Sequence, residues 1–468
     1  MTQYLIDLDR HKNLPLYIQL YEQIKKEILT GKLEPGRKMP SIRALSLQLN
    51  ISKNTVDTAY QQLLAEGYIT SRPQSGYFAA AVENALYAAR SNLADNEQSH
   101  ATERQGCLYD FRSDHIDQES FNFSLWRRFI NQALRNNKRF LNYGHYQGEP
   151  ALRIEIARYL RQSRAVDCTP EQIVIGAGVQ SLLHILCGLL GPLYHSIAFE
   201  DPGFKKAQYI FSDHQYTLLP IPLERDGLSI EALIQTKAKA VYVSPSHQFP
   251  LGAAMPVTKR SQLLKWAHDS GAVIIEDDYD SELRYFGRPI PSLQGMSSGS
   301  RVFYLGSFSK ILIPSLRISY MVIPPEYLPV LQHTLPKYNQ TSSAIEQIAL
   351  AAFIKEGWLE KHIKRLRKLY AGKNQLMVDA IRSSMGDKVS VQGKESGISL
   401  LLEIKTGLTS AQLVELAAQA GIKVTPVSHY YLDASAGNFP QILLSYAGIR
   451  KEDIIPAITL LQQAWFAV

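Results

Sequence analysis

The chain has 468 residues, of which 45% are hydrophobic and 20% charged, and its formal net charge is +7. These values are typical of globular proteins, and the length predicts more than one domain. Three cysteines without paired spacing, Cys107, Cys168 and Cys187, indicate neither a disulfide framework nor a metal site. Because no apolar run approaches membrane-spanning length and no leader pattern opens the sequence, we expect a cytoplasmic protein without a membrane partner.

The first eighty residues carry the pattern of a helix-turn-helix. Apolar residues recur on one stripe of residues 14–30 and predict a helix. Ser41 is a suitable N-cap for a second helix over residues 42–49, and Ser52 is a suitable N-cap for a third over residues 53–66. The second and third helices are separated by only about three residues, which is the spacing of a helix-turn-helix.

Polar residues occupy the first turn of the third predicted helix, which is the part of a recognition helix that enters a major groove. These residues are Ser52, Lys53, Asn54 and Thr55. Residues 68–71 and 77–78 then predict a small hairpin with Arg72 at its basic tip, as in a DNA-binding wing. Each residue alone is equally well explained as a solvated helix end. The short turn, the polar first turn and the wing together favour double-stranded operator DNA as a partner.

The segment LSLQLNISKNTVDTAYQQLLAEGYI closely resembles the GntR-type winged helix-turn-helix. That resemblance implies that Arg43 also contacts DNA, and it gives a DNA-binding domain over residues 1–79. Residues 80–107 are dominated by Ala, Asn, Ser, Glu and Arg without sustained apolar periodicity, as expected of a linker.

The remainder of the chain has the pattern of an α/β domain. Strands and helices alternate from about residue 173 to residue 322, which predicts a mainly parallel sheet. A long helical stretch and a further mixture of strands and helices follow. We therefore expect an α/β effector domain over residues 108–468, with a smaller subdomain over about residues 340–468.

One loop of this domain suits a carbonyl cofactor. An apolar strand at residues 302–305 is followed by Ser307, Ser309 and Lys310. A lysine at the end of a buried strand can be held neutral and form a Schiff base, while the serines bond a phosphate. Arg317 lies seven residues further on and is a candidate for a bidentate phosphate contact. From this segment alone, a surface lysine after a core strand is an equally good interpretation.

Segments upstream favour the cofactor. The apolar strand at residues 272–275 leads into Asp277 and Tyr279, and a carboxylate in that place is costly without a cation such as a pyridinium nitrogen. Tyr279 is placed to reach a phenolic oxygen. Residues 173–180 indicate a strand, a Gly-rich turn and a helix N-terminus, whose free N–H groups suit a phosphate. Phe204 follows one more strand and offers a ring for stacking.

The order of these segments resembles that of the fold-type I aminotransferases, which bind pyridoxal 5′-phosphate (PLP). The resemblance implies that Lys310 forms the aldimine, Asp277 pairs with the pyridine nitrogen, Tyr279 bonds the phenolic oxygen and Phe204 stacks on the ring. It implies a phosphate cup of Val179, Gln180, Ser307, Ser309 and Arg317. A DNA-binding module joined to such a domain is the layout of the MocR/GabR branch of GntR regulators, which are usually domain-swapped homodimers. PSHQFPLG, IIEDDYDSE and LRISYMV look closest to GabR-like members.

A working aminotransferase with an accessory DNA-binding domain is the alternative function. Aminotransferases usually have an asparagine that bonds the phenolic oxygen, where this chain has Phe249, and an arginine for the substrate carboxylate, where it has Leu443. Both losses weaken substrate positioning and cofactor tuning without preventing amine exchange at Lys310. We therefore favour a PLP-dependent transcriptional regulator that senses an amine or amino-acid-type effector, or PLP itself.

Two further residues are candidates for the effector's anionic end. The resemblance to GabR-like sensors places Lys206 and His429 where those proteins carry arginines for the ligand carboxylate. Neither side chain offers the planar, always charged fork of arginine. An amino acid, a dipeptide or PLP alone is then favoured over a GABA-type effector. The alternative is that Lys206 is a solvated helix residue and that His429 packs beneath Tyr430.

Overall fold

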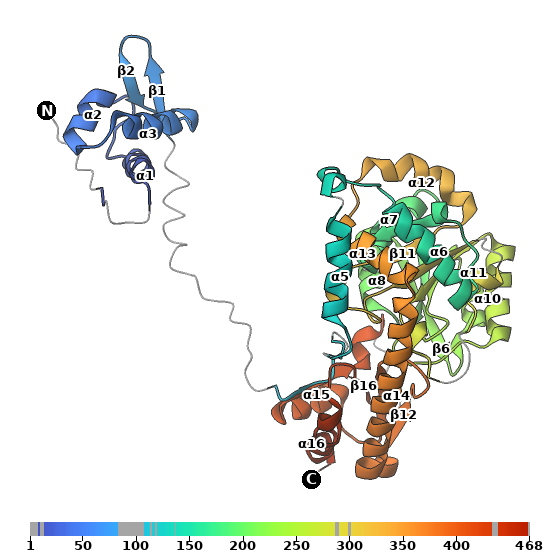
Figure 1. Ribbon diagram of the computed structural model, residues 1–468. Helices are drawn as coiled ribbons and strands as arrows, with labels where there is room; N and C mark the ends of the chain where they lie inside the picture. Colours follow the sequence, from blue (N-terminus) through green and yellow to red (C-terminus); the bar gives the residue numbers. More distant parts are fainter. Residues whose placement is uncertain are drawn as a thin grey trace. The chain divides into compact units, whose positions relative to one another are not determined.

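The structure is a computed structural model. It describes residues 8–9, 14–82, 107–112, 115–117, 119–135, 137–285, 290–297, 301–432 and 439–466. The chain divides into two compact units, residues 1–104 and 105–468 (Figure 1). Most of the expected linker at residues 80–107 lies outside the described residues. Within the described ranges, no helix is long and apolar enough to cross a membrane, and no cluster of three or more His, Cys, Asp or Glu residues could hold a metal ion.

The described residues of the first unit form three helices and a hairpin, and the hairpin projects from the helices (Figure 1). The elements are α1 (Leu16–Leu29), α2 (Ile42–Leu49), α3 (Lys53–Ala65) and the antiparallel pair β1 (Ile69–Arg72) and β2 (Gly76–Ala79). Both predicted caps are confirmed: Ser41 Oγ accepts from the N–H of Ala44 and Ser52 Oγ accepts from the N–H of Thr55, each at 3.1 Å. Asn50 ends α2 with a φ of 51°, a left-handed conformation that asparagine tolerates. The winged helix-turn-helix expected from the sequence is present.

The second unit is built on an eight-stranded sheet of order β4-β11-β10-β9-β8-β5-β6-β7. Its strands are β4 (Ile173–Gly176), β5 (Ser196–Asp201), β6 (Thr217–Glu224), β7 (Gly227–Leu228), β8 (Ala240–Val243), β9 (Val273–Asp278), β10 (Val302–Ser307) and β11 (Ser319–Val322). The central pairs from β10 to β6 are parallel, whereas β11 is antiparallel to both neighbours and β7 is antiparallel to β6. The sheet is therefore mixed with a parallel centre, as the mainly parallel pattern predicted.

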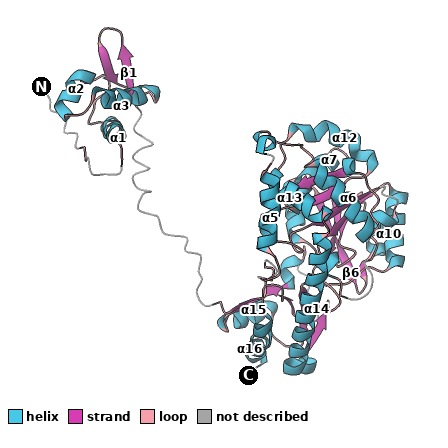
Figure 2. Cartoon of the chain, in the orientation of Figure 1, coloured by secondary structure: helices cyan, strands magenta, loops and turns pink. Residues whose placement is uncertain are grey.

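Helices cover both faces of the sheet (Figure 2). One face packs against α7 (Val179–Leu190), α8 (Lys205–Asp213) and α12 (Leu328–Thr334). The other faces α6 (Pro150–Arg164), α13 (Ala344–Lys355), α9 (Ile230–Gln235), α10 (Val257–Ser270) and α11 (Leu293–Met296), while α5 (Phe123–Leu134) packs on α13. Because strand side chains alternate, β10 sends Phe303 and Leu305 to the first face and Tyr304 to the second. Because both faces of the sheet are buried, the sequences of these strands are continuous apolar runs.

A smaller antiparallel sheet of order β12-β13-β16-β15 lies in the C-terminal part of this unit. Its strands are β12 (Val389–Gln392), β13 (Ser399–Ile404), β15 (Thr425–Pro426) and β16 (Gln441–Ser445), and its helices are α15 (Ser410–Gln419) and α16 (Ile454–Phe466). Two short strands, β3 (Tyr109–Asp110) and β14 (Ile422–Lys423), pair in parallel beside it. The 28-residue helix α14 (Trp358–Met385) contacts both α13 and α16, and so joins the two parts into one core (Figure 1).

Candidate functional site

A cavity of about 730 Å³ lies at the carboxyl ends of the central strands, between the large sheet and the smaller one. All nine residues predicted to hold the cofactor line it: Val179, Gln180, Phe204, Asp277, Tyr279, Ser307, Ser309, Lys310 and Arg317. The two residues predicted for the effector, Lys206 and His429, line the same cavity. Residues from five separate stretches of sequence thus converge on one site, whereas their individual roles stay predictions.

The N-terminus of α7 and the loop after β10 form an anion-binding end of this cavity. Gly178 precedes α7 with a φ of 90°, which residues with a side chain rarely adopt. A Cβ atom at Gly178 would lie 2.3 Å from Nη2 of Arg317, so the guanidinium packs directly on the glycine. The same Nη2 donates to the carbonyl of Ala177 at 3.0 Å, and Ser307 Oγ accepts from the N–H of Ser309 at 3.2 Å. Free helix N–H groups, hydroxyls and a guanidinium together fit a phosphate.

Strand alternation separates the three carboxylates at the end of β9. Asp277 faces the cavity, and Tyr242 on the neighbouring β8 donates a 2.5 Å hydrogen bond to its Oδ2 atom. Burial raises the pKa of Asp277 to about 7, although the hydrogen bond from Tyr242 opposes this. A cation beside the buried Asp277, such as a protonated pyridine nitrogen, would stabilise its carboxylate.

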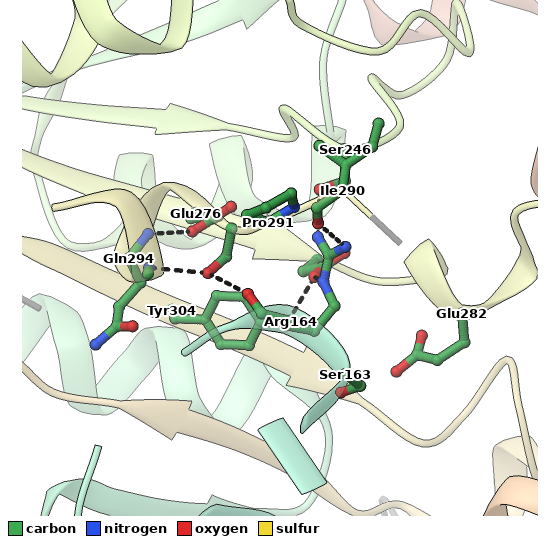
Figure 3. Close-up of polar contacts among 12 residues, drawn as sticks. Ser163, Arg164, Ser246, Glu276, Glu282, Ile290, Pro291, Gln294 and Tyr304 are labelled. Atoms are coloured by element: carbon green, nitrogen blue, oxygen red, sulfur yellow. Dashed lines mark hydrogen bonds and ion pairs between the residues drawn. The ribbon is translucent and has the colours of Figure 1, made fainter. Parts of the chain in front are cut away.

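Because strand side chains alternate, Glu276 and Asp278 lie on the opposite face of β9 from Asp277, and both are buried. Figure 3 shows Glu276 in a polar network with Arg164, Gln294 and Tyr304 nearby. Arg164, at the end of α6, donates from Nε to Oδ2 of Asp278 at 2.7 Å, and the hydroxyl of Tyr304 donates to the same oxygen at 2.5 Å. Glu276 accepts two backbone N–H groups at the start of α11, at 2.8 and 3.0 Å. The carboxylates of Glu276 and Asp278 therefore bond to other parts of the protein. Of residues 276–278, only Asp277 faces the cavity, where a cofactor can contact it.

Aromatic rings line the middle of the cavity. The ring of Phe249 makes edge-to-face contacts with Phe204, Tyr279 and Tyr430, at centroid distances of 6.4, 6.1 and 4.8 Å. The ring of Phe249 has no hydrogen-bond donor, whereas the neighbouring Tyr279 carries a hydroxyl. Burial raises the pKa of Tyr279 well above its ordinary value, which keeps that hydroxyl protonated.

The smaller sheet and the segment after β15 supply the opposite wall. Leu443 of β16, which the resemblance puts in place of the aminotransferase arginine, lies in the cavity wall with 3% of its surface exposed. Lys206 and His429 are both exposed on the rim. Lys205, which sequence reasoning missed, reaches across the rim, where its Nζ donates to the carbonyl of Tyr431 at 2.9 Å.

The six residues predicted to contact DNA lie on α2, on the first turn of α3 and on the wing of the other unit. They are Arg43, Ser52, Lys53, Asn54, Thr55 and Arg72. All except the partly buried Thr55 are exposed. Ser52 Oγ lies 2.9 Å from Oγ1 of Thr55, so these two hydroxyls are already used in shaping the helix start. The guanidinium of Arg72 stacks on the ring of Phe78 at 4.4 Å, which holds it at the wing.

Each of the two units matches a known protein family. Residues 16–78 match the family described as bacterial regulatory proteins, gntR family, and residues 117–458 match aminotransferase class I and II. The chain is 42% identical over 459 residues to the uncharacterized HTH-type transcriptional regulator YdeL of Bacillus subtilis, covering 98% of each. It is 34% identical over 480 residues to the probable rhizopine catabolism regulatory protein MocR of Rhizobium meliloti, covering 99% of this chain and 96% of that protein. The chain belongs to the MocR-type regulators of the GntR family.

One similar solved structure contains a derivative of the cofactor. LysN, an α-aminoadipate aminotransferase of Thermus thermophilus in complex with N-(5′-phosphopyridoxyl)-L-leucine, is 26% identical, with a TM-score of 0.68 over 77% of this chain and 92% of that one. This MocR-type regulator therefore has the fold-type I aminotransferase fold that the resemblance implied, and its cofactor is PLP. It is an HTH-type transcriptional regulator, and its N-terminal unit binds DNA.

Proposed function

We propose that this regulator senses an amine or amino-acid-type effector, or PLP itself, in the cavity lined by Lys310. The observation that carries the proposal is the composition of that cavity. It keeps Lys310, the buried Asp277 and an anion-binding end, yet Phe249 and Leu443 replace the two polar groups that aminotransferases usually direct at cofactor and substrate. A site of this kind can bind an amine at the cofactor while it holds substrate poorly for turnover.

Each group of residues has a distinct task in this proposal. PLP, when bound, supplies an aldehyde that condenses reversibly with primary amines. The α7 N-terminus, with Val179 and Gln180, and Arg317 would hold its phosphate, and Phe204 would face its ring. Asp277 would hold a proton on the pyridine nitrogen. Of the lysines that line the cavity, Lys310 is the one that would condense with this aldehyde, so an amine effector would compete with it.

Lys206 and His429 would bind the effector's anionic end. Lys206 and His429 lie on the rim of one cavity, one from α8 and one from the segment after β15. An ammonium and an imidazole bind a carboxylate as separate points rather than as a planar fork. This favours an amino acid, a dipeptide or PLP alone over a GABA-type ligand.

The regulator would act as a domain-swapped homodimer. Leu141 and Tyr143, two residues apart, are 84% and 83% exposed, which is unusual for large apolar side chains and supports a subunit interface around these two residues. Two N-terminal units would then bind two half-sites of an operator. The effector would change regulation by binding more tightly to one of two conformations that present these units differently.

A catalytic aminotransferase is the second candidate, because Lys310, Asp277 and Tyr279 all line the cavity. The two functions separate in one experiment. The PLP-loaded protein is titrated with candidate amino acids, with and without an added keto acid that can accept the amino group. Its visible absorbance, its operator binding and the amount of keto acid formed from the donor are followed. We expect the absorbance and the operator binding to change together, with no more than one keto acid per site. Repeated turnover without any change in operator binding would favour the enzyme.

A further inference from the structure

A buried histidine–aspartate pair stands directly behind Tyr279. Nδ1 of His247 lies 2.9 Å from Oδ1 and 2.8 Å from Oδ2 of Asp280, and these residues are only 7% and 1% exposed. The hydroxyl of Tyr279 lies 3.1 Å from the same Nδ1, and the two rings stack with centroids 5.8 Å apart. All three residues line the cofactor cavity.

The position of the hydrogens follows from this geometry. A carboxylate that approaches Nδ1 of His247 with both oxygens requires a hydrogen there, because the alternative sets lone pair against lone pair. Asp280 therefore fixes the hydrogen on Nδ1 whether the ring is neutral or protonated. Because Nδ1 then carries a hydrogen directed at Asp280, it has no lone pair to offer, and the hydroxyl of Tyr279, 3.1 Å away, cannot donate to it. The hydroxyl hydrogen of Tyr279 must then point elsewhere, and the cavity lies on its other side.

We propose that His247 and Asp280 form a positioning dyad that orients the Tyr279 hydroxyl as a hydrogen-bond donor toward the phenolic oxygen of PLP. The inference rests on the proposed role of Tyr279 at that oxygen. The dyad compensates for Phe249, whose ring offers no donor where aminotransferases usually have an asparagine. His247 acts through Tyr279 and is therefore a positioning residue.

Two glycines show that the space around the imidazole is shaped for it. A Cβ atom at Gly397, in the loop between β12 and β13, would lie 2.2 Å from Cε1 of His247 and 2.9 Å from Oδ2 of Asp280. A Cβ atom at Gly252 would lie 3.3 Å from Nε2 of His247. The φ angles of Gly252 and Gly397 are 75° and 80°, a region that favours glycine. Backbone from the large-sheet part, at Gly252, and from the small-sheet part, at Gly397, thus packs against the pair of His247 and Asp280.

The test is a pH titration of the visible absorbance that the PLP-loaded full chain shows through Lys310. A donor to the phenolic oxygen stabilises the form in which that oxygen is fully anionic, so loss of the donor moves the titration midpoint upward. Tyr279→Phe should raise the midpoint by about one pH unit, the size expected when a hydrogen bond to a charged group is lost. His247→Leu should move it in the same direction.

Two polar variants separate positioning from packing. His247→Asn keeps an N–H group near the place of Nδ1, whereas His247→Gln moves the amide further out. We expect the asparagine variant to keep a midpoint near that of the wild type and the glutamine variant to resemble His247→Leu. This pair also keeps the test decisive if His247→Leu does not fold. Thermal unfolding of the cofactor-free variants reports folding separately.

A double-mutant comparison decides whether His247 acts through Tyr279. In the Tyr279→Phe background, His247→Gln should cause no further shift, whereas an effect of charge or packing would persist there. An equal shift in both backgrounds, or a wild-type midpoint in His247→Gln and His247→Leu, would overturn the dyad while leaving the cofactor site intact. If the wild-type protein showed no visible band with PLP, the cofactor site and the dyad would fail together.

Discussion

The hydroxyl of Tyr242 donates a 2.5 Å hydrogen bond to Oδ2 of Asp277, and both side chains are almost fully buried. The two residues lie on the adjacent parallel strands β8 and β9. The hydrogen bond fixes the orientation of the Asp277 carboxyl, while burial raises its pKa to about 7. The pair is thus oriented for a cationic partner and remains unfavourable as an isolated anion.

Asp277 should make the stability of the cofactor-free protein depend on pH. Its folded-state pKa of about 7 lies above the ordinary aspartate value, so its stabilising contribution is full at low pH and is lost as the pH rises through about 7. The decline is about 1.4 kcal/mol per pH unit at most. Asp277→Asn removes this titration. Chemical unfolding between pH 5 and pH 8 should therefore show a shallower fall for the variant, and parallel curves would contradict the assigned shift.

Gly178→Ala should weaken the phosphate end selectively. The new Cβ would clash with the Arg317 guanidinium, and the alanine would have to adopt a φ near 90°, which residues with a side chain rarely do. We expect the Kd for PLP to rise at least tenfold, as befits the loss of a charge-assisted hydrogen bond of about 1.5–3 kcal/mol. Binding of pyridoxal, which lacks the phosphate, should change little. Gly188→Ala, on the same helix with no heavy atom within 4 Å of its Cβ, is the control; equal losses in both variants would refute the phosphate assignment.

Arg43, Lys53 and Arg72 should contribute to operator binding through phosphate contacts. Each of the three is exposed on the helix-turn-helix or the wing. Replacement of any one by alanine should weaken binding and flatten the dependence of log K on log salt by roughly one unit. Lys265→Ala, an exposed change on α10 of the other unit, should leave the slope unaltered. A reduced affinity with an unchanged slope would mean that the residue does not contact a phosphate.

Lys206→Ala and His429→Ala should weaken the effector response and spare PLP binding, because both side chains lie on the exposed rim. The measurement is the effector concentration that half-saturates the change in operator binding, which we expect to rise about tenfold in each variant, the size of one charge-assisted contact. Basal operator binding should stay as in the wild type. Unchanged midpoints in both variants would remove the rim from the effector site.

The sequence predicted the parts of the fold that depend on local patterns. Helix caps such as Ser41 and Ser52 act within one turn, and the apolar strands before Asp277 and Lys310 are recognisable from their own residues. Parallel strands bring their carboxyl ends to one edge, and the cavity lies there. The predicted cofactor residues therefore converge, although a role at the cofactor remains a prediction for each.

The missed residues are partners across the sheet. In the sequence, Tyr242 looks like one more residue of an apolar strand. Only the pairing of β8 with β9 brings its hydroxyl to Asp277. His247 and Asp280 lie 33 residues apart in sequence, so no local period connects them. A polar hydroxyl in the apolar run AVYV was the one local signal. The network around Arg164 likewise depends on where α6 ends against β9.

Whether the effector is sensed at Lys310 is decided by comparing operator binding by the wild-type chain and by Lys310→Ala. Both proteins are loaded with PLP and titrated with candidate amines and with further PLP, while operator binding and visible absorbance are recorded. We expect Lys310→Ala to melt like the wild type and to bind the operator, yet to lack the visible band and no longer to respond with the wild-type midpoint. A Lys310→Ala protein that kept the band, or responded to the same ligand at the same concentration, would contradict sensing at Lys310.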